Sequence, residues 1–151
     1  MNEADFLEYH NGGLGKLLGI SFLAATKDEV RAELPVGATH MTADDVVHGG
    51  VIMALADCTG AYGAVLNMPA GCTTATIESK TNFLRRGRGG LVRAAASPLH
   101  VGRKLSVWRT RVSRGDAVIA EVTQTQIYIE ARDKARSPDR SAAPATASAD
   151  R

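Results

Sequence analysis

A chain of 151 residues, 44% of them hydrophobic and 23% charged, has the length and composition of one globular domain with a single core. The formal net charge is +2, and five basic and three acidic residues follow residue 130, which leaves 13 of each sign before it. A neutral body without clustered cations lacks the electrostatic footprint that binds duplex nucleic acid. We therefore expect no nucleic-acid partner.

The chain begins with acidic and polar residues, whereas a secretory signal needs basic residues followed by an apolar run. Nowhere do about 18 apolar residues follow one another without interruption, as a membrane span requires. We therefore expect a cytoplasmic protein with no membrane partner. Cys58 and Cys72 show no CxxC or Cys/His ligand spacing, so we expect buried free thiols and no metal site.

The first 36 residues predict a short helix and then a hairpin. Residues 3–10 have an amphipathic helical pattern that the next glycines break, so residues 1–16 are expected to form an N-terminal helical segment. Residues 17–26 and 29–36 are short apolar or alternating runs on either side of a polar turn, which is a hairpin signal.

Residues 50–67 predict one long helix, and Asp57 is its only charged residue. A helix without a charged face is expected to be buried nearly all round. Gly60 and Gly63 cost roughly 1 kcal/mol each in a helix interior. Their presence predicts a neighbouring element that packs too closely to admit a Cβ atom.

Four strand patterns follow, at residues 73–84, 90–100, 104–113 and 117–129, with short turns rich in Gly and Arg between them. Strands joined in series by turns predict an antiparallel meander. The predicted fold class is α+β, with an antiparallel sheet that curls around one central helix.

The last predicted strand has one apolar face. Val118, Ala120, Val122 and Gln124 alternate with a second set that begins at Ile119, as expected for a sheet with one face on a core. After residue 130 the sequence is rich in Ala, Ser, Pro and charge and has no large apolar residue. The domain is therefore expected to span residues 17–130, and residues 131–151 are expected to be a disordered tail.

Asp57 is the first candidate for chemistry, because an ionised carboxylate in an apolar helix loses hydration worth several kcal/mol unless it is paired or hydrogen-bonded. The residues alone leave two interpretations open. Asp57 either accepts hydrogen bonds and only specifies packing, or it faces a cleft and acts as a nucleophile or general base.

The second candidate is the tripeptide His48-Gly49-Gly50, which is either a bare turn or an oxyanion site, because unpaired N–H groups at a helix start point outward. Gly49 and Asp57 are eight residues apart, about 12 Å along a helix axis at 1.5 Å per residue. Within one chain they cannot meet around one carbonyl. Two such helices antiparallel across a two-fold axis would bring them together, which predicts a dimer with shared sites.

Three segments together resemble a known family. Residues 48–57 (HGGVIMALAD), 76–85 (TIESKTNFLR) and 100–104 (HVGRK) are similar in sequence and separation to the PaaI-like hotdog-fold acyl-CoA thioesterases. The resemblance extends over residues 17–129. The combination of the three segments at these distances is far more specific than any one of them.

The resemblance implies a hotdog fold, in homodimers that often pair again into homotetramers. It implies hydrolysis of an acyl-CoA, with coenzyme A as part of the substrate and no separate cofactor. Asp57 matches the family's carboxylate, which attacks the thioester carbonyl or activates water. Gly49 matches the N–H oxyanion donor, and His48 would hold that loop and the thioester.

Two positions depart from the family pattern. Many relatives carry Asn or Gln six residues before the His, where this chain has Thr42, with one hydroxyl in place of an amide. Some relatives carry Ser or Thr four residues after the carboxylate, where this chain has Ala61. A hydroxyl at that place is therefore either dispensable or supplied by Thr74 or Thr76 on the following strand.

The resemblance also implies where the substrate binds. Contacts to the nucleotide phosphates are expected from among Arg85, Arg86, Arg88, Gly102, Arg103 and Lys104. The candidates for the acyl pocket are Met53, Tyr62, Thr74 and Thr76. Small residues on the helix leave room for a ring, so an aryl acyl group such as phenylacetyl or hydroxybenzoyl is favoured over a medium-chain acyl group. Competing functions on the same fold are a non-catalytic acyl-CoA-binding protein and an acyl-CoA hydratase or dehydratase.

Overall fold

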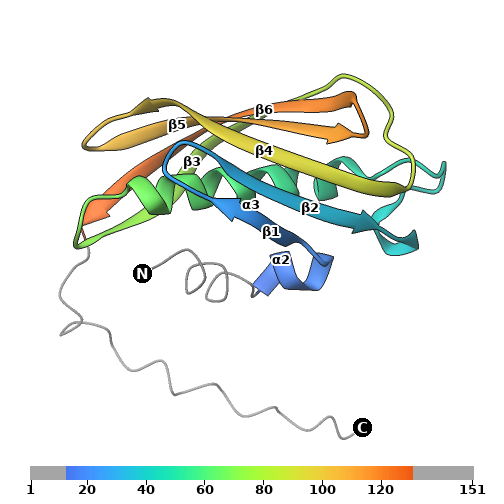
Figure 1. The fold of residues 1–151 in the computed structure, drawn as a ribbon, viewed down its shortest axis with the longest axis horizontal. Coiled ribbons are helices and arrows are strands. Elements are labelled where there is room, and N and C mark those ends of the chain that lie inside the picture. The colour runs from blue at the N-terminus through green and yellow to red at the C-terminus, as the bar shows by residue number, and fades with distance from the viewer. Residues whose placement is uncertain (1–12, 131–151) are drawn as a thin grey trace, which may run out of the picture.

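The computed structural model describes residues 13–130, which form one antiparallel sheet with a long helix against it (Figure 1). The strands lie in the order β1-β2-β4-β5-β6-β3. In chain order the elements are α2 (Gly13–Leu18), β1 (Ser21–Ala25), β2 (Val30–Val36), the 3-10 turn η1 (Ala38–His40), α3 (Gly49–Asn67), β3 (Cys72–Phe83), β4 (Gly90–Val101), β5 (Leu105–Arg114) and β6 (Ala117–Glu130). The predicted α+β class and the sheet around one central helix are confirmed.

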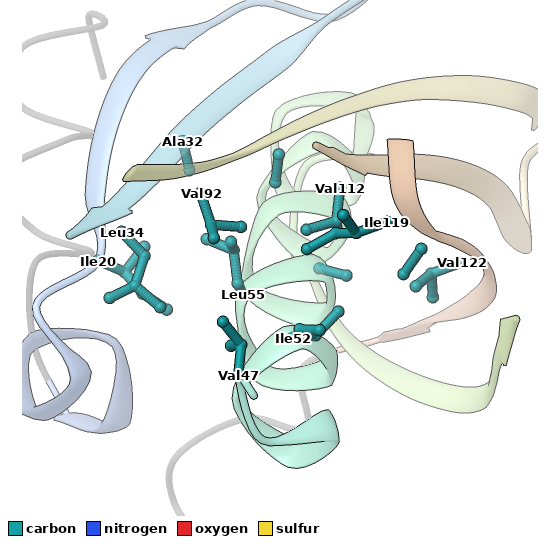
Figure 2. Close-up of a cluster of buried hydrophobic side chains, with 13 residues drawn as sticks. Ile20, Ala32, Leu34, Val47, Ile52, Leu55, Val92, Val112, Ile119 and Val122 are labelled. Atoms are coloured by element: carbon teal, nitrogen blue, oxygen red, sulfur yellow. The ribbon is translucent and has the colours of Figure 1, made fainter. Parts of the chain in front are cut away.

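The core lies between the sheet and one face of α3. The buried residues of the helix recur at intervals of three and four, as one helical stripe requires: Ile52, Leu55, Ala56, Thr59, Gly60, Gly63 and Ala64. Figure 2 shows Ile52 and Leu55 pointing toward Val92, Val112 and Ile119 of the sheet. The prediction of a helix buried nearly all round is wrong for a single chain, because Ala54, Ala61 and Val65 on the opposite side are only half-buried.

The prediction about Gly60 and Gly63 is confirmed. A Cβ atom on Gly60 would lie 2.4 Å from the Oε1 atom of Gln124, and one on Gly63 would lie 2.4 Å from the indole ring of Trp108. Side chains of β6 and β5 therefore fill the space that the missing Cβ atoms leave. The absence of side chains at these two positions lets α3 approach the sheet closely.

By length and composition α3 could cross a membrane, since an 18-residue window in it has a mean hydropathy of 1.4. The core helix of a protein outside the membrane meets the same criterion, and α3 packs along the sheet.

The predicted meander is wrong at its first step. The strands β4, β5 and β6 follow one another, but β3 pairs with β6 at the far edge and not with β4. The reason is the link at 84–89, which looks like a turn but crosses three strand spacings, about 14 Å at 4.8 Å each. Six residues are long enough for that crossing, and strand periodicity carries no information about the partner of a strand.

The amino-terminal prediction is partly wrong. Leu17 belongs to α2 and not to the first strand, because Gly19 adopts a φ of 75° directly after the helix and the strand begins only at Ser21. The hairpin of β1 and β2 is confirmed. The helix expected at 3–10 and the tail expected at 131–151 lie outside the described residues.

The alternation expected in β6 is interrupted at one place. Ala120, Val122 and Gln124 are buried as predicted, but Ile119 is buried with them and only 2% exposed. A register shift explains this, because Val112 pairs with Ala120 and the next residue of β5 pairs with Val118. The extra residue lets Ile119 turn inward and join the core.

Candidate active site

The start of α3 is a defined cap. His48 is the N-cap residue, and its Nδ1 atom accepts a hydrogen bond from the Gly50 N–H at 2.9 Å. Since Nδ1 accepts, a neutral imidazole here carries its proton on Nε2. The His48 N–H in turn donates to the carbonyl of His40 at 2.8 Å. His48 is therefore held in place, with an N–H donor on the far side of an exposed ring.

Gly49 supplies a free donor at the same helix end. The N–H groups of Val51 and Ile52 donate to the His48 carbonyl, and the Gly50 N–H donates to the imidazole. Within residues 13–130, the Gly49 N–H donates to no acceptor. A free N–H at the positive end of a 19-residue helix suits a developing oxyanion.

A cavity of about 400 Å³ opens beside Gly49. It lies between the loop before α3 and the end of β3, and it is lined by Thr42, Val46, Val47, Gly49, Ile52, Phe83, Leu84, Arg85, Arg86 and Gly87. A Cβ atom on Gly49 would lie 3.1 Å from the ring of Phe83, so glycine keeps this mouth open. No lining residue is acidic, so this cavity by itself has no carboxylate to act as a nucleophile or base.

Thr42 reaches the cavity but its hydroxyl is also part of a turn. The Oγ1 atom accepts from the Asp44 N–H at 3.3 Å, and the backbone of Thr42 pairs with Val46. Asp45, inside this turn, has a φ of 55°. The hydroxyl keeps its own proton to donate, so Thr42 can offer one hydrogen bond to a ligand in the cavity.

Asp57 lies half-buried in the middle of α3, on the side that faces β3 and β6. Its Oδ1 atom accepts from the Thr76 hydroxyl at 3.2 Å and from the Gln124 Nε2 at 3.4 Å. The structure therefore brings Asp57 and Thr76 together, as predicted for a hydroxyl from β3. Asp57 does not line the cavity beside Gly49, which agrees with the 12 Å expected along the helix.

Gln124 and Gln126 of β6 are polar neighbours of this carboxylate that sequence reasoning missed. Both are buried, with 0% and 1% exposure, and the Gln126 Nε2 donates to the Thr76 hydroxyl at 2.7 Å. Their positions in the strand could have indicated burial, because Gln124 and Gln126 lie on the same face of β6 as the buried Ala120 and Val122. A buried amide on an apolar strand face requires partners, and nothing in the sequence indicated which.

The candidates for the acyl pocket do not all lie together. Met53 is one turn before Asp57 on the same side of α3 and is 40% exposed. Tyr62 follows Asp57 by five residues, which turns it roughly 140° around the axis, and it packs against Phe22 of β1 at 4.3 Å between ring centroids. Thr74 is half-buried on β3 and hydrogen-bonds toward Gln126 and Ile127.

Tyr62 and Cys58 both lie partly buried on α3. Burial, and secondarily the nearby Cys58, raise the pKa of Tyr62 to about 12. Burial, and secondarily the charge of Asp57, raise the pKa of the Cys58 thiol. Both groups are therefore neutral at physiological pH. Cys58 and Cys72 are free thiols, and within residues 13–130 no cluster of His, Cys, Asp and Glu could hold a metal ion.

The predicted phosphate contacts fall into two groups at opposite ends of β4. Arg85, Arg86 and Arg88 precede the strand, whereas the turn 102–104 follows it. The 12 residues of β4, at about 3.3 Å per step from one residue to the next, separate the two groups by roughly 36 Å. One chain therefore does not bring the two groups to one nucleotide.

Within the first group, the Arg85 Nη1 donates to the Val118 carbonyl at 2.9 Å, and Arg85 and Arg86 both line the cavity. Arg86 and Arg88 are exposed. In the second group Arg103 and Lys104 are exposed, and the Gly102 N–H donates to the Leu105 carbonyl at 2.9 Å. A Cβ atom on Gly102 would lie 2.7 Å from the imidazole of His100. The five cationic side chains are therefore exposed to solvent, whereas Gly102 is half-buried with its N–H already hydrogen-bonded.

A six-stranded antiparallel sheet wrapped around one long apolar helix is the architecture of the hotdog fold. The family model of the Thioesterase superfamily matches residues 44–121, more than half of the chain. This match spans Gly49, Asp57, Thr74 and Thr76. The chain belongs to the Thioesterase superfamily, and it is a thioester hydrolase with the hotdog fold.

Named relatives agree with this assignment. The chain is 31% identical over 125 residues to a Pseudomonas aeruginosa protein provisionally named an esterase, which covers 79% of this chain and 85% of the relative. It is 28% identical over 101 residues to the 1,4-dihydroxy-2-naphthoyl-CoA hydrolase of Escherichia coli, covering 67% of this chain and 74% of that enzyme.

Solved structures agree as well. A thioesterase from Haemophilus influenzae superposes with a TM-score of 0.81 at 26% identity and covers 90% of this chain and 96% of that one. The PaaI protein of the Escherichia coli phenylacetic acid degradation operon superposes with a TM-score of 0.74 at 23% identity, covering 81% and 88%. The likeness to PaaI concerns the fold alone.

Proposed function

We propose that this thioester hydrolase cleaves an aryl acyl-CoA into a free acid and coenzyme A, with Asp57 as its catalytic carboxylate. The observation that carries the proposal is the setting of Asp57. It is the only charged residue of α3, it is half-buried and not sealed, and hydroxyl and amide donors hold one of its oxygens. Such a carboxylate is held in place by its donors and is still accessible to a ligand.

The chemistry needs a second group, which stabilises the oxyanion that forms when the thioester carbonyl is attacked. The free N–H of Gly49 at the start of α3 suits that role, with His48 beside it and the Thr42 hydroxyl at the same cavity. Direct attack by the Asp57 carboxylate breaks the C–S bond and forms an acyl anhydride, which water then hydrolyses to the free acid and Asp57. In the other route Asp57 takes a proton from the water that attacks the carbonyl. In both routes the coenzyme A thiolate leaves and is protonated to the thiol. Both routes consume one water and yield one acid and one thiol.

Two features support a site shared between two subunits. The cavity beside Gly49 has no acidic lining residue, and Asp57 lies about 12 Å away along α3. A second chain whose α3 runs antiparallel would bring its own Asp57 to this cavity.

The outer side of α3 and the edge of β3 are suited to such a partner. Ala54, Ala61 and Val65 form an uncharged strip along the helix, which a lone chain would leave half-exposed. The 12-residue strand β3 is at the edge of the sheet, with Ile77 59% exposed. A long uncovered edge strand is an aggregation hazard unless it is paired. Pairing of two β3 strands around a two-fold axis would cover both the edge of β3 and the uncharged strip of α3. Further association into a tetramer and a cytoplasmic location are parts of the same proposal.

The acyl group and the coenzyme complete the proposal. A relative that hydrolyses an aromatic acyl-CoA by name, 28% identical to this chain, supports an aryl group. Small side chains at Ala54 and Ala61 leave room for a ring, with Met53 at its border. Across the dimer, Arg85, Arg86 and Arg88 of one subunit and the turn 102–104 of the other would share the nucleotide phosphates.

The test is thiol release from a panel of aryl and medium-chain acyl-CoAs, measured with a thiol reagent. We expect Asp57→Asn to fold, to associate as the parent does and to bind acyl-CoA, while turnover falls by orders of magnitude. Asp116→Asn, which removes the same charge from an exposed turn, is the matched control and keeps full activity. Full turnover in Asp57→Asn would refute the proposed mechanism. Binding without thiol release would indicate a non-catalytic binding protein, and a change in double-bond absorbance would indicate a hydratase.

A further inference from the structure

Four polar side chains behind Asp57 come from two neighbouring strands. Thr74 and Thr76 lie on β3, and Gln124 and Gln126 lie on β6, which pairs with it. Gln124 and Gln126 are two residues apart, so both project into the core, and they are 0% and 1% exposed. Burying two amides in an apolar core costs free energy unless their hydrogen bonds are made, so their partners indicate their purpose.

The hydrogen bonds of Gln126 have a direction. Its Nε2 donates to the Thr76 Oγ1 at 2.7 Å, and its Oε1 lies 3.2 Å from the Thr74 hydroxyl, which also lies 3.1 Å from the Ile127 carbonyl. In the opposite amide orientation, the Gln126 Oε1 would face Thr76, and the Thr76 hydroxyl would have to donate its only proton to Gln126. Only the lone pairs of the Thr76 oxygen would then face the Asp57 carboxylate, and they cannot donate to it. The orientation present leaves that proton free for the Asp57 Oδ1 at 3.2 Å.

Gln124 reaches the same carboxylate from the other side. Its Nε2 lies 3.3 Å from the Asp57 carbonyl and 3.4 Å from Oδ1. Its Oε1 is buried without a hydrogen-bond partner in the described part of the chain, against the bare Cα of Gly60. Gly60 therefore makes the room for an amide whose donor end faces Asp57.

Both donors bind the Oδ1 atom of Asp57. Within residues 13–130, the Oδ2 atom accepts no hydrogen bond from a side chain. We propose that Gln124 and Gln126 are positioning residues, Gln124 directly and Gln126 through the Thr76 hydroxyl. They anchor one oxygen of Asp57 and leave the other to meet the thioester or the water. The proposal rests on the proposed function of Asp57 and extends it to two residues that never touch the substrate.

The experiment is a double-mutant cycle on full-length protein. Thr76→Val removes the hydroxyl at constant shape, Gln126→Met removes the amide at similar length, and Thr76→Ser keeps the hydroxyl. We expect each of the first two to lower kcat about 10- to 100-fold with little change in KM, because orientation of the reacting oxygen is lost and binding is not. Thr76→Ser should restore most of kcat. The double variant should be no slower than the slower single variant, since both act through one hydroxyl.

Thr73→Val is the matched control, because its hydroxyl donates only to the Ile129 carbonyl on the same strand pair at 3.4 Å. It should keep the parent kcat. Fluorescence of Trp108 and the elution volume check that every variant folds and associates. If Gln126→Met does not fold, Gln124→Met tests the direct donor to Oδ1 instead, and it should lower kcat with little change in KM. If Asp57→Asn is inactive while Thr76→Val and Gln126→Met keep the parent kcat, or if their losses multiply, the positioning role is refuted. If Asp57→Asn stays active, the proposed function fails instead.

Discussion

The contact between Gly63 and Trp108 allows a stability prediction to be worked out from distances. A Cβ atom on Gly63 would lie 2.4 Å from both Cη2 and Cζ3 of the indole and 2.7 Å from Cε3. Carbon atoms in contact prefer about 3.5–4.0 Å, so Gly63→Ala requires the ring or the helix to move by more than about 1 Å. Trp108 is 0% exposed and its Nε1 donates to Ser106 at 3.1 Å, so the ring has no free direction to move.

Two effects of opposite sign decide the outcome of Gly63→Ala. Alanine in place of glycine inside a helix gains roughly 1 kcal/mol from helix propensity. Overpacking a well-filled core costs about 1–3 kcal/mol and occasionally more, and three overlapping ring atoms favour the upper end. We therefore expect a net loss of about 2 kcal/mol in the free energy of unfolding.

Gly15→Ala provides a control for the propensity gain, because Gly15 is also helical and no atom of residues 13–130 lies within 4 Å of the position that the added methyl group would take. That variant should be neutral or more stable by up to about 1 kcal/mol. Urea unfolding measures both, at one protein concentration, with the emission of Trp108, the single tryptophan, as the signal. If Gly63→Ala is as stable as Gly15→Ala, the close approach of α3 to β5 is not what requires glycine there.

Two further predictions concern α3. In a Cys72→Ser background, Asp57→Asn should speed the alkylation of Cys58 by iodoacetamide at mildly alkaline pH. Removing the negative charge lowers the raised pKa of the Cys58 thiol and so increases the fraction present as thiolate. The rate should rise by less than about tenfold, because burial, the larger cause of the raised pKa, remains. An unchanged rate would show that the charge of Asp57 is not felt at Cys58. Gly49→Ala should lower kcat/KM about tenfold with the fold intact, because the methyl group would lie 3.1 Å from the ring of Phe83, which is 54% exposed and can move into the cavity. Unaltered kinetics would exclude Gly49 from the site.

The elements of this fold were predictable to within a few residues because they follow local rules. Strand alternation, turn residues and the apolar run of α3 each depend on neighbours in the chain. The position of β3 was not predictable in this way, because its pairing with β6 is decided by the path of the link 84–89 over the curved sheet. Sheet order is a tertiary property, and periodicity describes only the faces of a strand.

The candidate site divides in a similar way. Asp57 was identifiable because one charge in an apolar helix is an anomaly that the sequence displays, and His48 and Gly49 because they precede that helix. Gln124 and Gln126 were not identifiable as partners of Asp57, since 67 residues separate Gln124 from it. The contact of Gln124 depends on α3 lying against β6 at Gly60, and that of Gln126 with Thr76 depends on the pairing of β6 with β3. Both are tertiary arrangements that the sequence pattern does not contain.

The eight-residue interval between Gly49 and Asp57 in α3 constrains where homologous chains can gain or lose residues. Inserting one residue between them would rotate Asp57 by about 100° around the axis of α3 and lengthen the interval by about 1.5 Å. The carboxylate would then point away from Thr76 and Gln124. We therefore expect homologous chains to gain or lose residues in the turns between strands, while the eight-residue interval inside α3 stays constant.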